Sequence, residues 1–203
     1  MDFLVEMTTH VPSGTSAEVV DEIRAREAVR ARELVADGHL LRLWRPPLAP
    51  GQWRTFGLFA AEDADQLEEQ LASMPLRVWR TDVVTPLLAH PNDPRRGSAS
   101  PQLTEFLTTL TIAVPPGAST DDVDDRQARE ALRAAELADQ GRLVRLWKLA
   151  AETGQRRTLG LWGAADEAGL TSTLRSLPLY DWMAVDVTPL SVHPSDPARG
   201  ATS

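Results

Sequence analysis

The sequence predicts an α+β protein built from two tandem copies of one domain, each with the element order β-α-β-β-α-β. Three observations support this fold class: an internal repeat, alternating apolar patterns typical of strands, and two helical patterns with start and stop signals in each repeat. Shifted by about 103 residues, the chain matches itself without a gap, and roughly 45 of about 95 aligned positions are identical. The chain is therefore a duplicated domain.

The repeat fixes the expected domain boundaries. Leu40–Arg45 returns as Leu143–Lys148, and Val84–Leu87 returns as Val187–Leu190. Copy one spans residues 1–97 and copy two spans residues 104–203. The segment 89–105, rich in proline, serine and arginine, resembles the end of the chain. We therefore expect it to be the tail of copy one, serving as the linker to copy two.

The first strand and the long helix of copy one have clear boundaries. Phe3–Val11 alternates loosely between apolar and polar residues, and Pro12–Gly14 ends this strand. Thr15–Glu18 forms a capping-box start for a helix that runs to Asp37, and Gly38 is its stop signal.

The other elements follow from the same signals: a strand at Leu40–Arg45, a turn at Pro46–Gly51, a strand at Gln52–Ala60, a helix from Asp63 through Leu71, and a strand within Leu76–Leu88. This order is the ferredoxin-like split β-α-β fold. Two helices cover one face of such a sheet, and the other face must also be buried. We therefore expect the two copies to pair as an intramolecular dimeric α/β barrel.

Composition narrows the class of function. A net charge of −8 and a pI near 5.0 argue against a nucleic-acid surface. The chain has no cysteine, no apolar run long enough to span a bilayer and no basic region of a signal peptide at its first residues. These features predict a cytoplasmic protein that contacts neither nucleic acid nor membrane. Lys148 is the only lysine, which argues against Schiff-base chemistry.

A carboxylate stands on the apolar side of the long helix. Val20, Ile23, Glu27, Ala31 and Leu34 follow one another at steps of three and four, so they share one helical stripe. A carboxylate on such a stripe either finds a partner or has its pKa raised by desolvation, and the second case makes a proton-transfer group. The pattern repeats around Glu130, so Glu27 and Glu130 are the candidate catalytic residues.

A structural role for each carboxylate stands beside the catalytic one. Glu27 has Arg24, Arg26 and Arg30 as neighbours on its own helix, and any of them would be a simple ion-pair partner. Arg126 lies one turn before Glu130, where copy one has an isoleucine. We expect Arg126 to pair with Glu130 and to lower its pKa, which would leave copy one with the better base.

Each copy resembles the muconolactone Δ-isomerase family over nearly its whole length. The resemblance is carried by the helix bearing Glu27, by Gly38 followed by Leu43-Trp44-Arg45, by Pro75-Leu76, and by Val84–Leu87 leading to His90–Asp93. It implies a dimeric α/β barrel that assembles into larger oligomers and needs no metal or organic cofactor. It also implies a proton shift within an unsaturated lactone, with the helix glutamate as general acid/base.

The chain departs from this family's pattern in three ways. Family members normally carry one domain per chain, whereas this chain carries two. The hairpin at Pro46–Gly51 is longer than usual. Where the family often has Pro-Tyr-Met before the last strand, the copies have Val78-Trp79-Arg80 and Asp181-Trp182-Met183. These differences leave the substrate open.

Basic and aromatic residues on the second and third strands are candidates for substrate binding. Alternation places Arg42 and Trp44 on one face and Arg45 on the other. A guanidinium could hold a substrate carboxylate or stabilise a dienolate, and the alternative is an interface ion pair beside a tryptophan that fills core volume. The predicted set is Arg42, Trp44, Arg45, Arg54, Arg145, Trp147 and Lys148.

His90 and His193 each precede a proline in a tail rich in turn-forming residues, and we expect them to dock the tail. No pair of histidines or carboxylates has the spacing of metal ligands, and no metal site is expected. The resulting hypothesis is a cofactor-independent isomerase of unsaturated lactones or related carbonyl compounds, with a homo-oligomer built from intrachain pseudo-dimers as a possible assembly. The alternatives are an isomerase or cyclase of a larger hydrophobic substrate in biosynthesis, and a ligand-binding protein without catalysis.

Overall fold

The computed structural model describes residues 1–151 and 155–198. Copy one contains β1 (Asp2–Thr9), α1 (Ala17–Ala36), β2 (Leu40–Arg45), β3 (Arg54–Ala60), α2 (Ala64–Ala72), the 3-10 helix η1 (Pro75–Trp79) and β4 (Arg80–Ala89). Copy two contains β5 (Thr104–Ala113), α3 (Thr120–Asp139), β6 (Leu143–Leu149), β7 (Gln155–Ala164), α4 (Glu167–Arg175), η2 (Tyr180–Trp182) and β8 (Met183–Val192). The predicted β-α-β-β-α-β order is confirmed in both copies.

The strands form one closed hydrogen-bonded order, β1-β3-β2-β8-β5-β7-β6-β4, in which β4 also pairs with β1. The neighbouring strands in this order are antiparallel. The expected tandem ferredoxin-like fold is thus confirmed, and its eight strands follow one another in a ring order.

The chain divides into two compact units that do not coincide with the two copies. Unit 1 contains Met1–Leu87 and Ser191–Ser203, and unit 2 contains Leu88–Leu190. Each unit therefore holds the body of one copy and the tail of the other. In unit 1, Ser191 and Val192 at the end of β8 pair with β2. In unit 2, the end of β4 pairs with β6 in the same way.

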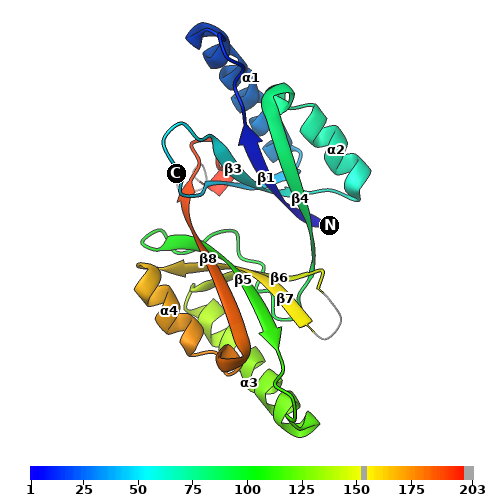
Figure 1. Cartoon of the computed structure of the whole chain (residues 1–203), viewed down its shortest axis with the longest axis vertical. Helices are drawn as coiled ribbons and strands as arrows, with labels where there is room; N and C mark the ends of the chain where they lie inside the picture. The colour runs from blue at the N-terminus through cyan, green and yellow to red at the C-terminus, as the bar shows by residue number, and fades with distance from the viewer. Residues whose placement is uncertain (152–154, 199–203) are drawn as a thin grey trace. The chain divides into compact units, whose positions relative to one another are not determined.

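In unit 1, α1 and α2 cover one face of the sheet (Figure 1). Phe3, Val5 and Met7 alternate along β1 and pack against Leu34 of α1 and Leu71 of α2. Each fully buried side chain of this kind contributes about 1.5–3 kcal/mol relative to an exposed one. The core lies under the second half of α1, and none of the residues in its first half is buried.

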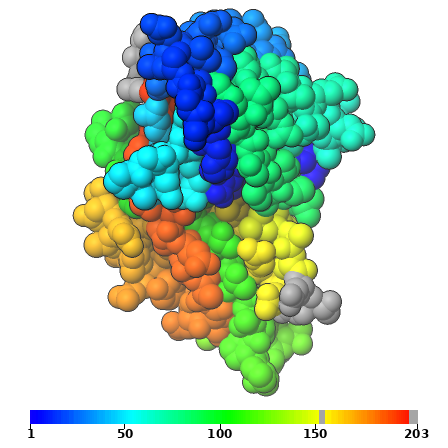
Figure 2. Space-filling view, turned by 45° about the horizontal axis from the view of Figure 1, so that its top comes forward, coloured from blue at the N-terminus to red at the C-terminus, as the bar shows by residue number. Residues whose placement is uncertain are grey.

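Unit 2 repeats this arrangement with α3 and α4 on one face of its sheet. Figure 2 shows β5 in green running between β8 in orange and the β6–β7 hairpin in yellow, in agreement with the pairing of β5 to both β7 and β8. Phe106 and Leu110 of β5 pack against Leu137 of α3 and Leu174 of α4.

The helices start and stop close to the predicted signals, but the capping box at Thr15–Glu18 is not formed, because the N-cap is Ser16 and the residue three positions later is Val19. Ser16 is the N-cap of α1, and its hydroxyl accepts a hydrogen bond from the backbone N–H of Val19. Asp63 caps α2 and accepts from the N–H of Gln66. Gly38 follows α1 with a φ of +76°, a conformation that glycine adopts without steric cost.

Candidate functional site

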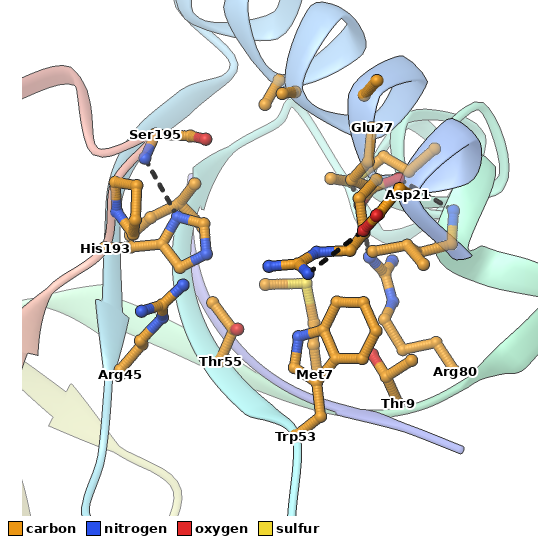
Figure 3. Close-up of a pocket in the computed structure, with 18 residues that line it drawn as sticks. Met7, Thr9, Asp21, Glu27, Arg45, Trp53, Thr55, Arg80, His193 and Ser195 are labelled. Atoms are coloured by element: carbon orange, nitrogen blue, oxygen red, sulfur yellow. Dashed lines mark hydrogen bonds and ion pairs between the residues drawn. The ribbon is translucent and has the colours of Figure 1, made fainter. Parts of the chain in front are cut away.

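A cavity of about 340 Å³ in unit 1 lies beside α1, the strands β1 to β3, η1 and the tail segment His193–Ser195. Figure 3 shows Glu27 and Arg80 on one side of this cavity, and Arg45 and His193 on the opposite side. An acid/base group and two nitrogen-bearing side chains thus face the same space from opposite walls.

Glu27 is held in place from two directions. The backbone N–H of Leu76 in η1 donates to Oε2 at 2.8 Å, and Nη1 of Arg80 lies 3.3 Å from Oε1. Burial raises the pKa of Glu27 above its usual value, the Leu76 hydrogen bond and the charge of Arg80 oppose this rise, and the charge of Asp82 adds to it. The side chain is 14% exposed, so it lines the cavity without opening fully to water.

Arg80 belongs to a buried charge network at the start of β4. Its Nε lies 2.7 Å from Oδ1 of Asp82, and Arg77 reaches the same carboxylate at 2.8 Å. The side chains of Arg80 and Asp82 are 2% and 3% exposed. A cation that is itself paired and buried here holds a fixed position beside Glu27.

The opposite wall supplies hydrogen-bond donors. The backbone N–H of Ser195 donates to Nδ1 of His193 at 3.1 Å, so the neutral ring carries its proton on Nε2. Arg45 lies on the same wall (Figure 3). Together they can donate hydrogen bonds to an anionic oxygen within the cavity.

Trp53 occupies another part of the wall in unit 1. The guanidinium of Arg24 lies 5.3 Å from the centre of its ring, within the range of a cation–π contact. Arg24 also lies 3.7 Å from Asp21, so both charges are partly compensated at the protein surface. This cluster lines the cavity next to the first half of α1.

An equivalent cavity of about 570 Å³ lies in unit 2. Its carboxylate is Glu130, whose Oε2 accepts from the backbone N–H of Leu179 at 3.0 Å. Burial raises the pKa of Glu130, and this hydrogen bond opposes the rise. Within residues 1–151 and 155–198, no lysine or arginine pairs with Glu130.

The expected ion pair between Arg126 and Glu130 was wrong. Nε of Arg126 donates to Asp122 at 3.2 Å, its Nη1 donates to the carbonyl of Pro178 at 3.2 Å, and its guanidinium stacks over Trp182 at 4.6 Å. Asp122 lies on the preceding turn of α3, whereas Pro178 and Trp182 lie in the segment that follows α4.

The alternative that Glu27 pairs with an arginine of its own helix was also wrong. Arg24 pairs with Asp21, Arg26 with Glu22 and Arg30 with Glu33. The cation beside Glu27 is Arg80, so an arginine stands by the carboxylate in copy one and not in copy two. An adjacent arginine lowers the pKa of a carboxylate, and we expected this effect at Glu130. The structure places the arginine at Glu27 instead.

His90 and Lys148 face the cavity of unit 2 as His193 and Arg45 face that of unit 1. Nδ1 of His90 accepts from the N–H of Asn92 at 3.1 Å. Burial and the charge of Lys148 lower the pKa of His90, while Asp93 opposes this shift. Both tail histidines thus line a cavity in addition to any role in docking the tail.

Four predicted substrate-binding residues hold the tails instead. Arg42 donates to Asp196 at 3.0–3.2 Å and lies 4.7 Å from the ring centre of Trp44. The N–H of Leu43 donates to the same carboxylate at 3.1 Å. Arg145 makes the equivalent contact with Asp93 and lies 4.5 Å from the ring of Trp147.

Arg42, Trp44, Arg145 and Trp147 line neither of the two cavities, because alternation places them on the other face of their strands. These two cavities give no support to a substrate contact by the four residues, and the alternative of an ion pair beside a core tryptophan describes their contacts. Arg54 also lies outside both cavities and pairs with Glu6 at 3.1 Å. Arg45 and Lys148 remain as candidates.

Sequence reasoning missed Arg80 and Trp53 as parts of the site. Arg80 was visible only as a departure from the family's pattern before the last strand. Its distance of 53 residues from Glu27 gives no local signal of contact. Arg45 follows Trp44, and Lys148 follows the equivalent Trp147. This repeated basic residue was the available signal for the opposite wall.

Within the part of the chain that the structure describes, no three histidine or carboxylate side chains are grouped so that they could hold a metal ion. None of the described helices has the length and apolar character required to cross a membrane.

Known proteins resemble both the copies and the fold. A family model described as muconolactone delta-isomerase matches residues 1–93 and again residues 104–196. Muconolactone Delta-isomerase 1 of Acinetobacter lwoffii is 33% identical over 95 residues, which cover 47% of this chain and 96% of that protein. A muconolactone Delta-isomerase of Cupriavidus pinatubonensis is 32% identical and is covered completely by 47% of this chain.

The solved structure of a chlorite dismutase from Candidatus Nitrospira defluvii is also similar to this chain, with a TM-score of 0.56 and 10% identity. The alignment covers 94% of this chain and 91% of the chlorite dismutase chain. This likeness shows the fold alone. The two family matches cover both halves of the sequence, and each matched half contains a helix glutamate that lines a cavity. The chain belongs to the muconolactone Δ-isomerase family, with two copies of the family's domain fused in tandem.

Proposed function

We propose that this protein is an isomerase that moves a proton between two carbons of an unsaturated lactone, with Glu27 and Glu130 as the acid/base groups of two separate sites. One observation carries the proposal: in each unit the helix glutamate lines a cavity, is held by a backbone N–H, and has its pKa raised by burial. Membership of the family supports the class of reaction.

The proposed reaction has two proton transfers. The ionised carboxylate removes a proton from a carbon next to the double bond, and the electron pair of the broken C–H bond forms a dienolate whose charge lies on the carbonyl oxygen. The carboxylic acid then returns the proton to the carbon two atoms away, which restores the carbonyl and shifts the double bond. A base with a raised pKa in a partly enclosed cavity suits both steps.

The opposite wall would stabilise the dienolate. In unit 1, Arg45 and Nε2–H of His193 face the cavity, and in unit 2 Lys148 and His90 take these places. Donors fixed in position before the reaction stabilise developing negative charge without reorganisation. A substrate carboxylate would use the same cations.

Glutamine substitutions test the proposal. Glutamine keeps an oxygen that accepts from Leu76 or Leu179 but cannot take up a proton. The double variant Glu27→Gln/Glu130→Gln is expected to lower kcat for muconolactone by about 10²–10⁴-fold, the usual contribution of a general acid/base. Glu33→Gln/Glu136→Gln is the matched control, because these carboxylates lie on the same two helices and pair with arginines at the surface.

Full activity in the double glutamine variant would overturn the assignment of Glu27 and Glu130 as the acid/base groups. Absence of turnover in the unmodified chain would favour a ligand-binding protein without catalysis. The single variants address the two sites separately. We expect Glu27→Gln and Glu130→Gln to reduce muconolactone turnover unequally, because only Glu27 has an arginine beside it. Equal losses would contradict this inequality.

A further inference from the structure

The two cavities can be compared position by position because the copies align without a gap. Glu27 corresponds to Glu130, Thr55 to Thr158 and Leu43 to Leu146, and all of these line their cavities. The equivalent positions that carry different residues therefore indicate how the two cavities have diverged.

The first difference is the charge network next to the carboxylate. In unit 1 it consists of Arg77, Arg80 and Asp82. The corresponding residues in copy two are Tyr180, Met183 and Val185, which pack against the hydrophobic core of unit 2. The surroundings of the carboxylate are thus charged in unit 1 and apolar in unit 2.

The second difference is the wall formed by the third strand of each copy. Trp53 of unit 1 fills this wall and is covered by Arg24. Copy two has Arg156 in place of the tryptophan and Gln127 in place of the arginine. An aromatic surface has been replaced by a flexible cation.

The two cavities also differ in volume and in the charged residues that line them. The cavity of unit 2 holds about 570 Å³ and that of unit 1 about 340 Å³. The difference exceeds the roughly 150 Å³ cavity that accommodates a benzene molecule in a protein core. Lys148, Arg156 and Arg157 line the larger cavity. Arg24, Arg45 and Arg80 line the smaller one, where Arg24 pairs with Asp21 and Arg80 pairs with Asp82. The apolar side of the larger cavity includes Leu110, Ile112 and Met183.

We propose that unit 2 is a separate binding site for a larger amphipathic anion, a carboxylate attached to an apolar body of about two rings, which unit 1 does not admit. The carboxylate would lie against the cations of β6 and β7, and the apolar body would lie against Leu110, Ile112 and Met183. The two copies would then act on different members of one substrate class, the smaller one in unit 1. The identity of the reaction rests on the proposed function, but the binding preference does not.

Calorimetric titration of the full chain with 2-naphthylacetate tests this inference. This probe has the required carboxylate and two-ring body but no lactone, so its binding is independent of turnover. We expect one binding site per chain. Arg156→Trp/Met183→Arg, which gives unit 2 the residues of unit 1, should weaken binding at least tenfold, where roughly 1.4 kcal/mol corresponds to a factor of ten.

The reciprocal variant is the matched control. Trp53→Arg/Arg80→Met gives unit 1 the residues of unit 2, and it should keep the original site and add a second one. Circular dichroism checks that each variant is folded. If the unit 2 double variant does not fold, Met183→Trp, which fills the cavity without adding charge, should give the same loss of binding.

Two sites in the unmodified chain, loss of its site in the Trp53→Arg/Arg80→Met variant, or no binding of the probe would each overturn the inference. The proposed function has a different readout. Naphthylacetate bound in unit 2 together with full muconolactone turnover by Glu27→Gln/Glu130→Gln would overturn the isomerase mechanism and leave the second binding site standing.

Discussion

At the scale of single residues, two identical side chains at equivalent positions have different surroundings. Both Glu27 and Glu130 accept a hydrogen bond from the backbone that follows the second helix of their copy, and burial raises the pKa of both. Only Glu27 has a buried arginine nearby. The substitution that creates this difference, Arg80 against Met183, lies at the start of the last strand of each copy and not on the helix that carries the carboxylate.

The raised pKa of Glu130 predicts how its substitution affects stability. A group whose pKa is higher in the folded state stabilises the fold fully below its unfolded pKa, near 4.5, and this contribution is lost as the pH rises through the folded pKa. Glutamine imitates the protonated form. Glu130→Gln is therefore expected to raise Tm relative to the unmodified chain at pH 8 and to leave it nearly unchanged at pH 4.

Thermal unfolding followed by circular dichroism at both pH values measures this effect. Glu136→Gln, an exposed substitution about 1.7 turns further along the same helix, should show no such pH dependence. A lower Tm for Glu130→Gln at pH 8 than at pH 4, each relative to the unmodified chain, would show that the folded protein favours the ionised carboxylate.

At the scale of elements, the tails do more than link the copies. Each tail begins as the end of a long strand, pairs with the second strand of the other copy, and places a histidine at a cavity. A buried aspartate then fixes the tail on an arginine of the second strand. The tail is thus both a structural clamp and one wall of the candidate site.

Removal of Asp196 should destabilise unit 1. Its side chain is fully buried against Arg42, and removal of one partner of a buried ion pair costs about 3–5 kcal/mol. We expect Asp196→Ala to lower the free energy of unfolding, measured in urea, by an amount in this range. Asp93→Ala should cost less, because Arg145 is 16% exposed.

Asp139→Ala is the control for this comparison. Asp139 is 88% exposed and lies 3.8 Å from Arg96, and exposed pairs contribute about 0–1 kcal/mol. If Asp196→Ala cost no more than Asp139→Ala, the arginine clamp would not be what holds the tail.

At the scale of the whole molecule, fusion makes each copy depend on the other. The cavity of unit 1 includes residues from both ends of the sequence, and the cavity of unit 2 includes the tail of copy one. A single copy therefore does not contain every residue of either candidate site.

Shortening the chain after Val192 should impair the candidate site of unit 1 and leave that of unit 2 intact. The shortened chain lacks His193 and Asp196, both of which belong to unit 1. In a Glu130→Gln background, where turnover depends on Glu27, we expect this chain to lose most of its muconolactone activity. In a Glu27→Gln background the shortening should have little effect, because the tail in unit 2 is intact. Equal losses in both backgrounds would contradict the assignment of the tail to one site.

The duplication, the order of elements in each copy and the inward side of the long helix could all be predicted from the amino-acid sequence. These features depend on local spacing. Steps of three and four residues place Glu27 on the same helical face as Ala31 and Leu34. The N-cap residues Ser16 and Asp63 mark where α1 and α2 begin.

Only the tertiary structure decided which charges meet. Arg126 was expected to pair with Glu130 because it lies one turn away, but it found Asp122 and a carbonyl of a later segment. Glu27 is joined by an arginine 53 residues away, and Arg42 by an aspartate 154 residues away. Helical spacing predicts which side chains can contact one another within one helix. The ion-pair partner of a charged side chain also depends on which strand or tail packs against that helix in the folded protein.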